Sequence, residues 1–88
     1  MTEPLDIRRK RLAIRAWRRG IKEMDLILGG YADAELAGMD ARDMDGFEAL
    51  MAEDDHDIYQ WVSGQAAPPE AHAALVEDLK TRKAASER

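Results

Sequence analysis

The sequence predicts an all-α protein, a compact bundle of five helices in a single domain. Apolar side chains recur at helical spacing, and glycine, proline and aspartate residues divide the 88-residue chain into short segments. No β-branched run alternates with period two, the pattern of a half-buried strand. A chain of this length fits one domain. We expect that domain to span residues 1–88, with an ordered core at about residues 5–82.

The first expected helix runs from about Leu5 to Arg19 and follows Pro4, because proline suits the first turn of a helix. An apolar stripe at helical spacing predicts the side that faces the core. Its members are Ile7, Ile14, Trp17 and Ile21, and Leu12, Ala13 and Ala16 widen it. Arginines fill the remaining faces, so this helix is expected to be strongly basic.

The second expected helix spans about Ile21 to Leu36, and Met24, Leu28 and Tyr31 continue its apolar face. Its first turn carries acidic side chains, which the positive end of the helix dipole favours. Gly29 and Gly30 each cost about 1 kcal/mol relative to alanine. Tyr31 nevertheless keeps the phase of the stripe, so we expect one continuous but weakened helix.

Three shorter helices are expected in the remainder of the chain. Asp40 is a suitable N-cap for the third, at about residues 41–52. An acidic hinge at residues 53–57 precedes the fourth, whose short apolar face is Ile58, Trp61 and Val62. The fifth is expected from about Pro69 to Arg82, and residues 83–88 are expected to fray because they lack an apolar anchor.

Charge is segregated along the chain, although the net charge is only −5. Residues 1–22 hold eight Lys or Arg against two acids (+6), residues 23–57 hold one Arg against twelve acids (−11), and residues 58–88 balance. Such segregation indicates either steering of a partner or pairing between segments. A small regulatory adaptor that binds nucleic acid or another acidic partner through its basic first helix is therefore the alternative function. The acidic total argues against a general nucleic-acid binder.

A catalytic or metal centre is not expected. The chain has no cysteine, and His56 and His72 lack the i, i+4 spacing of a helical zinc pair, so both are interpreted as surface or rim residues. An EF-hand centred on Gly46 would place Ala41 and Ala52 at its first and twelfth positions, where carboxylates are essential. No apolar run approaches the ~20 residues of a membrane span. The first residues lack the apolar segment of a signal peptide, so a cytoplasmic protein is expected.

Aromatic residues provide one candidate for partner contact. Trp17 and Trp61 are expected in the core. Tyr59 lies on a different face of the fourth helix from Trp61 and is the better candidate for exposure. Trp, Tyr and Arg dominate the energetics of protein interfaces, so an exposed tyrosine here would suit a partner.

The junction between the first two helices, Arg18-Arg19-Gly20-Ile21-Lys22-Glu23, leaves two interpretations open. In the first, an arginine–glutamate pair clamps a tight corner between two helices. In the second, the corner is a rigid docking surface. Gly20 would then let another backbone approach closely, and Glu23 would hold an arginine suited to bidentate recognition of carboxylates.

One pattern resembles a known family. Arg19-Gly20-x-x-Glu23-x-Asp25, after a basic helix and before Leu26-Ile27-Leu28, is similar to the succinate dehydrogenase assembly factors, the SdhE-type flavinylation factors. Further matches are Phe47-Glu48-Ala49-Leu50, Asp57-Ile58-Tyr59-Gln60-Trp61 and the Pro68-Pro69 loop. The resemblance covers roughly residues 8–80.

The resemblance implies a five-helix chaperone that is not itself an enzyme. Members of the family bind the flavoprotein subunit of succinate dehydrogenase, and sometimes of fumarate reductase, and promote covalent attachment of FAD to a histidine of that subunit. By this resemblance Arg19, Gly20 and Glu23 form the contact surface, with Arg18 and Asp25 beside them. No stably bound cofactor is expected, because the sequence offers no glycine loop that could cradle a phosphate, and a monomer is expected.

Overall fold

The structure is a computed structural model that describes residues 3–86, and the side chains of residues 3–83. Its elements are α1 (Leu5–Trp17), α2 (Lys22–Glu35), a single 3₁₀ turn η1 (Leu36–Gly38), α3 (Ala41–Met51), α4 (Asp55–Val62) and α5 (Glu70–Ser86). Residues 3–86 contain no strand. The predicted all-α architecture of five helices is therefore confirmed.

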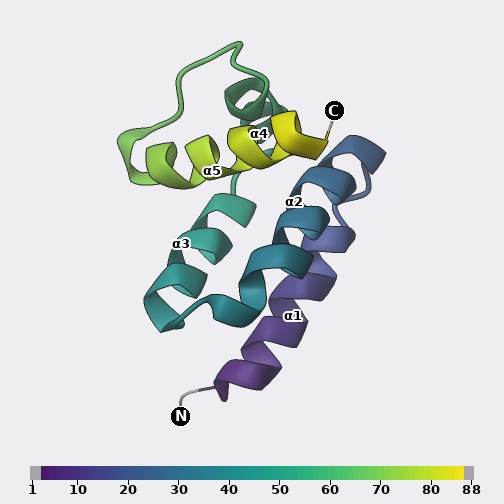
Figure 1. The fold of residues 1–88 in the computed structure, drawn as a ribbon, viewed down its shortest axis with the longest axis vertical. Helices are drawn as coiled ribbons and strands as arrows, with labels where there is room; N and C mark the ends of the chain where they lie inside the picture. Colours follow the sequence, from purple (N-terminus) through teal and green to yellow (C-terminus); the bar gives the residue numbers. More distant parts are fainter. Residues whose placement is uncertain (1–2, 87–88) are drawn as a thin grey trace.

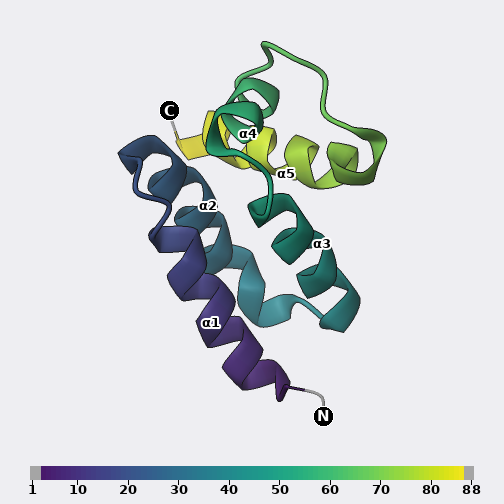
Figure 2. The same ribbon diagram turned by 180° about the vertical axis from the view of Figure 1, so that it is seen from behind.

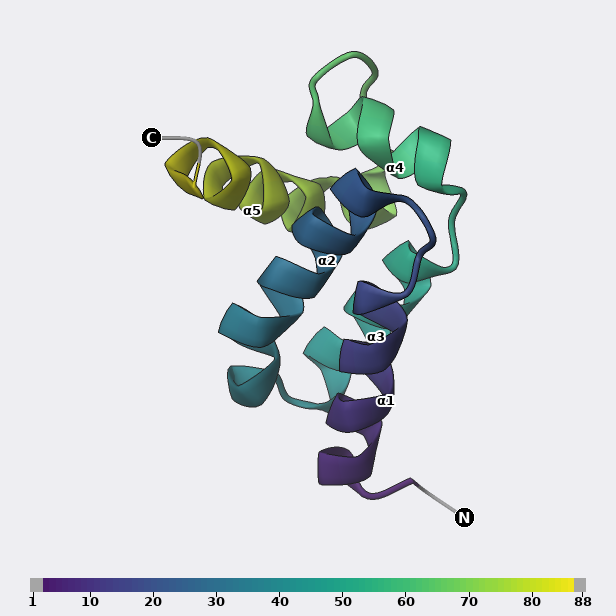
Figure 3. The ribbon, with the colours of Figure 1, turned by 90° about the vertical axis from the view of Figure 1, so that its right-hand side faces the viewer.

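The first two helices form the long axis of the molecule. α1 and α2 run antiparallel side by side, and α3 lies next to them (Figure 1). α5 crosses over one end of this group and packs against α2, α3 and α4 (Figures 1 and 2). Seen from the side, the connection between α1 and α2 lies at the end of the molecule that carries α4 and α5 (Figure 3).

A single core joins all five helices. Its fully buried members are Leu12, Ala16, Met24, Leu28, Met44, Phe47, Leu50, Met51, Ile58, Val76 and Leu79, and Val62 of α4 is nearly so. The rings of Phe47 and Tyr31 pack with their centroids 5.7 Å apart. Among residues 3–86, no helix is both long and apolar enough to cross a membrane.

The face of α1 that packs on the core is only part of the predicted stripe. Ile7, Ile14 and Ile21 are all more than half exposed, whereas Leu12 and Ala16 are completely buried. The spacing of the stripe was right for a helix, but α1 has apolar residues on two sides and periodicity alone cannot choose between them. Ala16 faces inward, where its small side chain lets α1 pack closely against the neighbouring helix. The large β-branched residues are left facing solvent.

Trp17 was expected in the core, and it instead covers α2 from the outside. Its side chain is 39% exposed. Its indole nitrogen Nε1 donates a hydrogen bond to Asp33 Oδ1 at 3.1 Å. The ring lies so close to Gly29 that a Cβ at that position would be 2.2 Å from it. The absence of a side chain at Gly29 thus leaves the space that the indole ring of Trp17 occupies. α2 continues through Gly29 and Gly30 as predicted.

Most predicted helix ends are confirmed. Asp40 caps α3 by accepting a hydrogen bond from the backbone nitrogen of Asp43 at 2.8 Å, and Asp54 in the acidic hinge caps α4. α5 extends to Ser86, beyond the predicted end at Arg82. Residues 87 and 88 lie outside the described residues, so the expected fraying of the tail stays a prediction.

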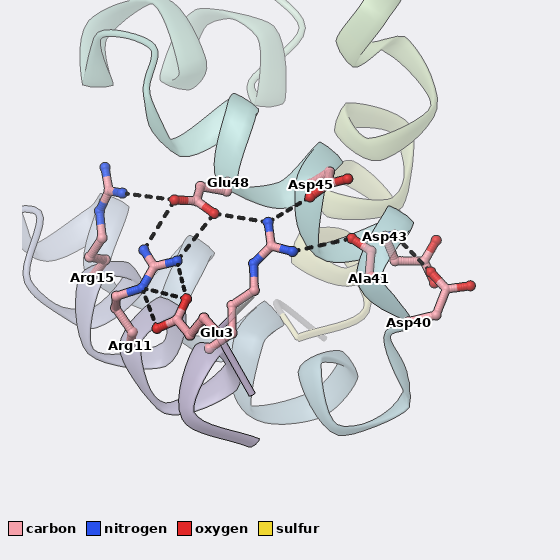
Figure 4. A network of polar contacts seen from close by, with 9 residues as sticks. Glu3, Arg11, Arg15, Asp40, Ala41, Asp43, Asp45 and Glu48 are labelled. Atoms are coloured by element: carbon pink, nitrogen blue, oxygen red, sulfur yellow. Dashed lines mark hydrogen bonds and ion pairs between the residues drawn. The ribbon is translucent and has the colours of Figure 1, made fainter. Parts of the chain in front are cut away.

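The basic face of α1 is joined to α3 by ion pairs (Figure 4). Glu48 accepts hydrogen bonds from Arg8 and Arg11, each at 3.0 Å, and lies 3.6 Å from Arg15. Arg8 also binds Asp45, and Arg11 also binds Glu3. The hydrogen bond from Arg11, and then that from Arg8, lowers the pKa of Glu48 below its ordinary value. Pairing between the basic and acidic segments therefore accounts for part of the charge segregation.

Candidate functional site: the corner between α1 and α2

The turn from α1 into α2 is built around Gly20. Its φ of +91° lies in the left-handed region, which glycine adopts at little cost and other residues avoid. A Cβ at Gly20 would meet no heavy atom within 4 Å. The backbone conformation therefore favours glycine here, whereas crowding within the chain does not. The space outside the turn is open to a visiting molecule.

The inner side of the corner is fixed by Arg19, whose side chain is only 12% exposed. Its Nε donates to Asp55 Oδ1 at 2.6 Å, and its two terminal nitrogens donate to the backbone carbonyls of Met51 and Glu53. These acceptors belong to the end of α3, the hinge and the start of α4. One guanidinium group therefore ties the corner to a segment more than 30 residues away in sequence.

Asp25 fixes the same corner from the α2 side. Its Oδ1 accepts a hydrogen bond from the backbone nitrogen of Arg19 at 2.7 Å. The carboxylate lies in the first turn of α2, where the helix dipole favours negative charge. The backbone of the turn is thus held by one side chain from each direction.

The outer side of the corner faces solvent. Arg18, Gly20 and Glu23 are exposed, and neither the side chain of Arg18 nor that of Glu23 has a hydrogen-bonding partner among the described residues. Ile21 and Leu26 add apolar surface beside them and are 51% and 55% exposed. A cation, an anion and large apolar groups therefore share one surface around an open glycine turn. We call the surface formed by Arg18, Gly20, Ile21 and Glu23 the outer corner.

The two interpretations of this junction each hold for part of it. A clamp exists, but its acid is Asp55 and not Glu23, so the predicted arginine–glutamate pair is wrong. Arg19 and Asp25, both named as candidate contact residues, lie on the inner side and already have partners in this chain. Arg18, Gly20 and Glu23 lie on the outer side. The contact role of each of these residues stays a prediction.

Tyr59, the remaining candidate, lies in a groove that begins at the outer corner. The groove has a volume of about 490 Å³ and runs between α2, α4 and α5. Glu23 and Tyr59 both line it, as do Leu26 and Arg82. Tyr59 is half-buried and packs against the core. The structure thus brings two candidate residues together that are 36 positions apart in the sequence.

Sequence reasoning missed two residues of the corner. The sequence places Asp55 only in a polar hinge, because nothing in its local spacing shows that it meets Arg19. Trp17 was assigned to the core, although the adjacent glycine pair in α2 was a signal that a large side chain packs there. His72 was interpreted as a surface or rim residue, but it is buried, with Nε2 3.1 Å from Glu53 Oε2.

Fewer arginines of α1 are free to bind a partner than the sequence suggests, because several already have partners within this protein. Besides the arginines that bind Glu48, Arg9 donates to the backbone carbonyls of Leu36 and Met39 at 3.3 and 2.8 Å. Within residues 3–86, no group of three or more metal-ligating side chains is arranged to hold an ion. The outer corner is therefore the surface most clearly left without an internal role.

Fold and corner together define a class: a small all-helical protein whose distinctive surface is a solvent-facing corner, locked from within. Residues 10–83 match the Sdh5 family, described as the flavinator of succinate dehydrogenase. The chain belongs to this family, and the resemblance seen in its sequence is confirmed.

Named relatives agree with this membership. The "Succinate dehydrogenase assembly factor 2, mitochondrial" of Candida glabrata is 41% identical over 63 residues, which is 72% of this chain and 41% of the relative. The Saccharomyces cerevisiae protein of the same name is 41% identical over 61 residues, 69% of this chain and 38% of the relative. The "FAD assembly factor SdhE" of Acetobacter pasteurianus is 32% identical over 84 residues, 90% of this chain and 77% of the relative. The matches thus span about two fifths of the mitochondrial proteins.

Proposed function

We propose that this protein is an assembly factor that binds the flavoprotein subunit of succinate dehydrogenase and promotes covalent attachment of FAD to it. The flavoprotein subunit of fumarate reductase is a second client in this proposal. The observation that carries the proposal is the outer corner, which is exposed on one side and locked by Arg19 on the other. The names of the bacterial and mitochondrial relatives support the choice of client.

A locked corner suits docking for an energetic reason. Binding costs the ordering of side chains and loops at the interface, and a turn that is already fixed avoids part of that cost. Gly20 lets the partner's backbone approach, and Arg18 and Glu23 offer charges of both signs for specific pairing. The backbone of the outer corner therefore reaches the partner already ordered.

The contribution to flavin attachment in this proposal is positional. The protein holds the domains of the folding flavoprotein so that the acceptor histidine faces the flavin ring, and the groups of the flavoprotein perform the bond formation. Holding reactants in a productive arrangement can supply several kcal/mol of a barrier without any catalytic side chain. The protein itself acts as a monomer and retains no FAD.

The experiment compares two substitutions at one position. Any side chain at Gly20 meets the same unfavourable φ, at about 1–2 kcal/mol, so Gly20→Ala and Gly20→Arg share a loss of stability. Only Gly20→Arg adds bulk and charge in the open space. Cells that lack the gene are complemented with each variant, and covalent flavin on the flavoprotein is measured by in-gel fluorescence at matched protein abundance.

We expect the wild type to restore covalent flavin, Gly20→Ala to retain most of it and Gly20→Arg to lose it. Unchanged covalent flavin in cells that lack the gene would contradict the assembly function. Normal flavin with Gly20→Arg would contradict the assignment of the outer corner alone.

The alternative function, nucleic-acid binding through α1, has less support. Arg8, Arg9, Arg11 and Arg15 already contact acidic side chains or backbone carbonyls of this chain. Counterion release by many free cations drives nucleic-acid binding and makes it steeply salt-dependent. An electrophoretic shift assay across salt concentrations separates the two proposals, and we expect no salt-dependent shift.

A further inference from the structure

We infer that the groove between α2, α4 and α5 receives a segment of the same flavoprotein that presents a large apolar side chain with an acidic residue next to it. This inference rests on the proposed function, because it takes the client from there. It adds a second contact, distinct from the outer corner, and gives the chemistry of what binds in it.

The lining of the groove matches an apolar anchor. Ile27, Tyr31 and Leu79 form its buried or half-buried part, and Leu26 stands at its edge with more than half of its surface exposed. A volume of about 490 Å³ accommodates one or two large side chains together with their backbone. Burial raises the pKa of the Tyr31 hydroxyl, so this phenol stays neutral in the groove.

Gly30 keeps the groove open. It lies in the middle of α2 among the lining residues, and a Cβ there would meet no heavy atom within 4 Å. At its neighbour Gly29, in contrast, the space that a side chain would need is filled by the Trp17 ring. The glycine pair in α2 therefore serves two purposes: one glycine accepts a side chain of this protein, and the other leaves room for a side chain from outside.

Charges at the two ends of the groove give the occupant a direction. Glu23 lies in the first turn of α2, and Arg82 reaches Glu35 in the last turn at 3.0 Å. Twelve helical residues separate these positions along α2, or about 18 Å. The Arg82–Glu35 pair is exposed, and such pairs contribute little to stability, so Arg82 can turn to a carboxylate of a partner at small cost.

Continuity with the outer corner selects the occupant. Glu23 belongs to both surfaces, so a flavoprotein bound at the corner already has its chain beside the groove. A second contact on the same partner then forms at high effective concentration. A second copy of this chain would have to compete with a partner that is already held there.

The test fills the groove without harming the fold. Gly30→Leu adds a side chain in open space and removes a helix-weakening glycine, so the variant is expected to be folded and at least as stable as the wild type. Gly46→Leu is the matched control, because Gly46 is also helical and free of neighbours at its Cβ position, but it is exposed and lies on α3 away from the groove. The probe is the purified flavoprotein subunit without covalent flavin, and its affinity is measured by calorimetry.

We expect Gly30→Leu to weaken binding by about tenfold or more, and Gly46→Leu to remain within about twofold of the wild type. A photo-crosslinker at Leu26 should join a flavoprotein segment with a large apolar residue and a neighbouring acid, whereas one at Ile7, which is similarly exposed, should not.

Each contrary outcome identifies what is wrong. Wild-type protein that does not bind the flavoprotein overturns the proposed function and this inference together. Binding that is lost with Gly20→Arg but unchanged with Gly30→Leu overturns the groove alone. Sedimentation that shows a wild-type dimer and a monomeric Gly30→Leu variant assigns the groove to a second copy of this chain and also overturns the inference.

Discussion

Arg18 and Arg19 are neighbours in sequence, yet they lie on opposite sides of the same corner. Arg19 points inward and donates to one carboxylate and two carbonyls, whereas the side chain of Arg18 is exposed and has no partner among the described residues. The same side-chain chemistry thus holds the corner together at one position and remains available at the next. Residue type alone does not separate a structural arginine from a docking arginine, and the direction of the side chain does.

The largest expected effect comes from removing the inner arginine. Arg19→Ala leaves the half-buried Asp55 carboxylate and two backbone carbonyls without their donor, so the free energy of unfolding should fall by about 3 kcal/mol. Arg18→Ala should change it by less than about 0.5 kcal/mol. Thermal unfolding of both variants measures the contrast. Equal melting temperatures for the two would contradict the division of the corner into two sides.

The glycine pair in α2 gives the next largest contrast. Gly29→Ala forces the Trp17 ring from its place and should cost about 1–3 kcal/mol. Gly30→Ala meets no neighbour and should stabilise the helix by about 0.5–1 kcal/mol. Urea unfolding of the two variants should give shifts of opposite sign. Two shifts of the same sign would show that Trp17 does not depend on Gly29.

Acid should weaken the ion pairs between α1 and α3 by a smaller amount. The folded-state pKa of Glu48 is lowered, chiefly by its hydrogen bond from Arg11, so its contribution is present above the ordinary value of 4.5 and is lost as the pH falls through the folded-state pKa. The free energy of unfolding should therefore decrease between neutral pH and about pH 3. Glu48→Gln should be less stable at neutral pH by about 1 kcal/mol and should show a flatter pH dependence. An unchanged slope would assign the acid sensitivity to other carboxylates.

The smallest effect on stability is expected at Glu23. Glu23→Ala removes an exposed carboxylate without a partner, so the melting temperature should change by no more than about 2–4 °C. Its affinity for the flavoprotein should nevertheless fall, since Glu23 lies on both the outer corner and the groove. A large loss of stability would instead indicate that Glu23 holds the corner together, as Arg19 does.

Helices and caps could be predicted from the sequence because both depend on neighbours along the chain. Asp40 and Asp54 cap their helices through bonds over two or three residues, and α2 kept its apolar phase through Gly29 and Gly30. The family was also recognisable, since its motif is local. The predicted stripe of α1 was too wide: Leu12 and Ala16 face the core, whereas Ile7 and Ile14 do not, and spacing alone could not separate the two sets.

The candidate site was predictable only in part for the same physical reason. The motif located the corner and gave Gly20 its place in a turn. Which charges point outward depends on Asp55, which lies 36 residues beyond Arg19 and meets it only after folding. The groove that joins Glu23 to Tyr59 likewise exists only once α4 and α5 have packed on α2.

The indole of Trp17 gives this protein a built-in optical reporter. Its ring is partly exposed to solvent, rests on Gly29 and belongs to the last residue of α1, at the start of the corner. The second indole, at Trp61, has its ring centroid 5.9 Å from that of the His72 imidazole. Replacing Trp61 with phenylalanine would leave a single tryptophan in this protein, next to the outer corner. A blue shift of that emission on mixing with the flavoprotein would then follow the arrival of the partner in real time, without any attached dye.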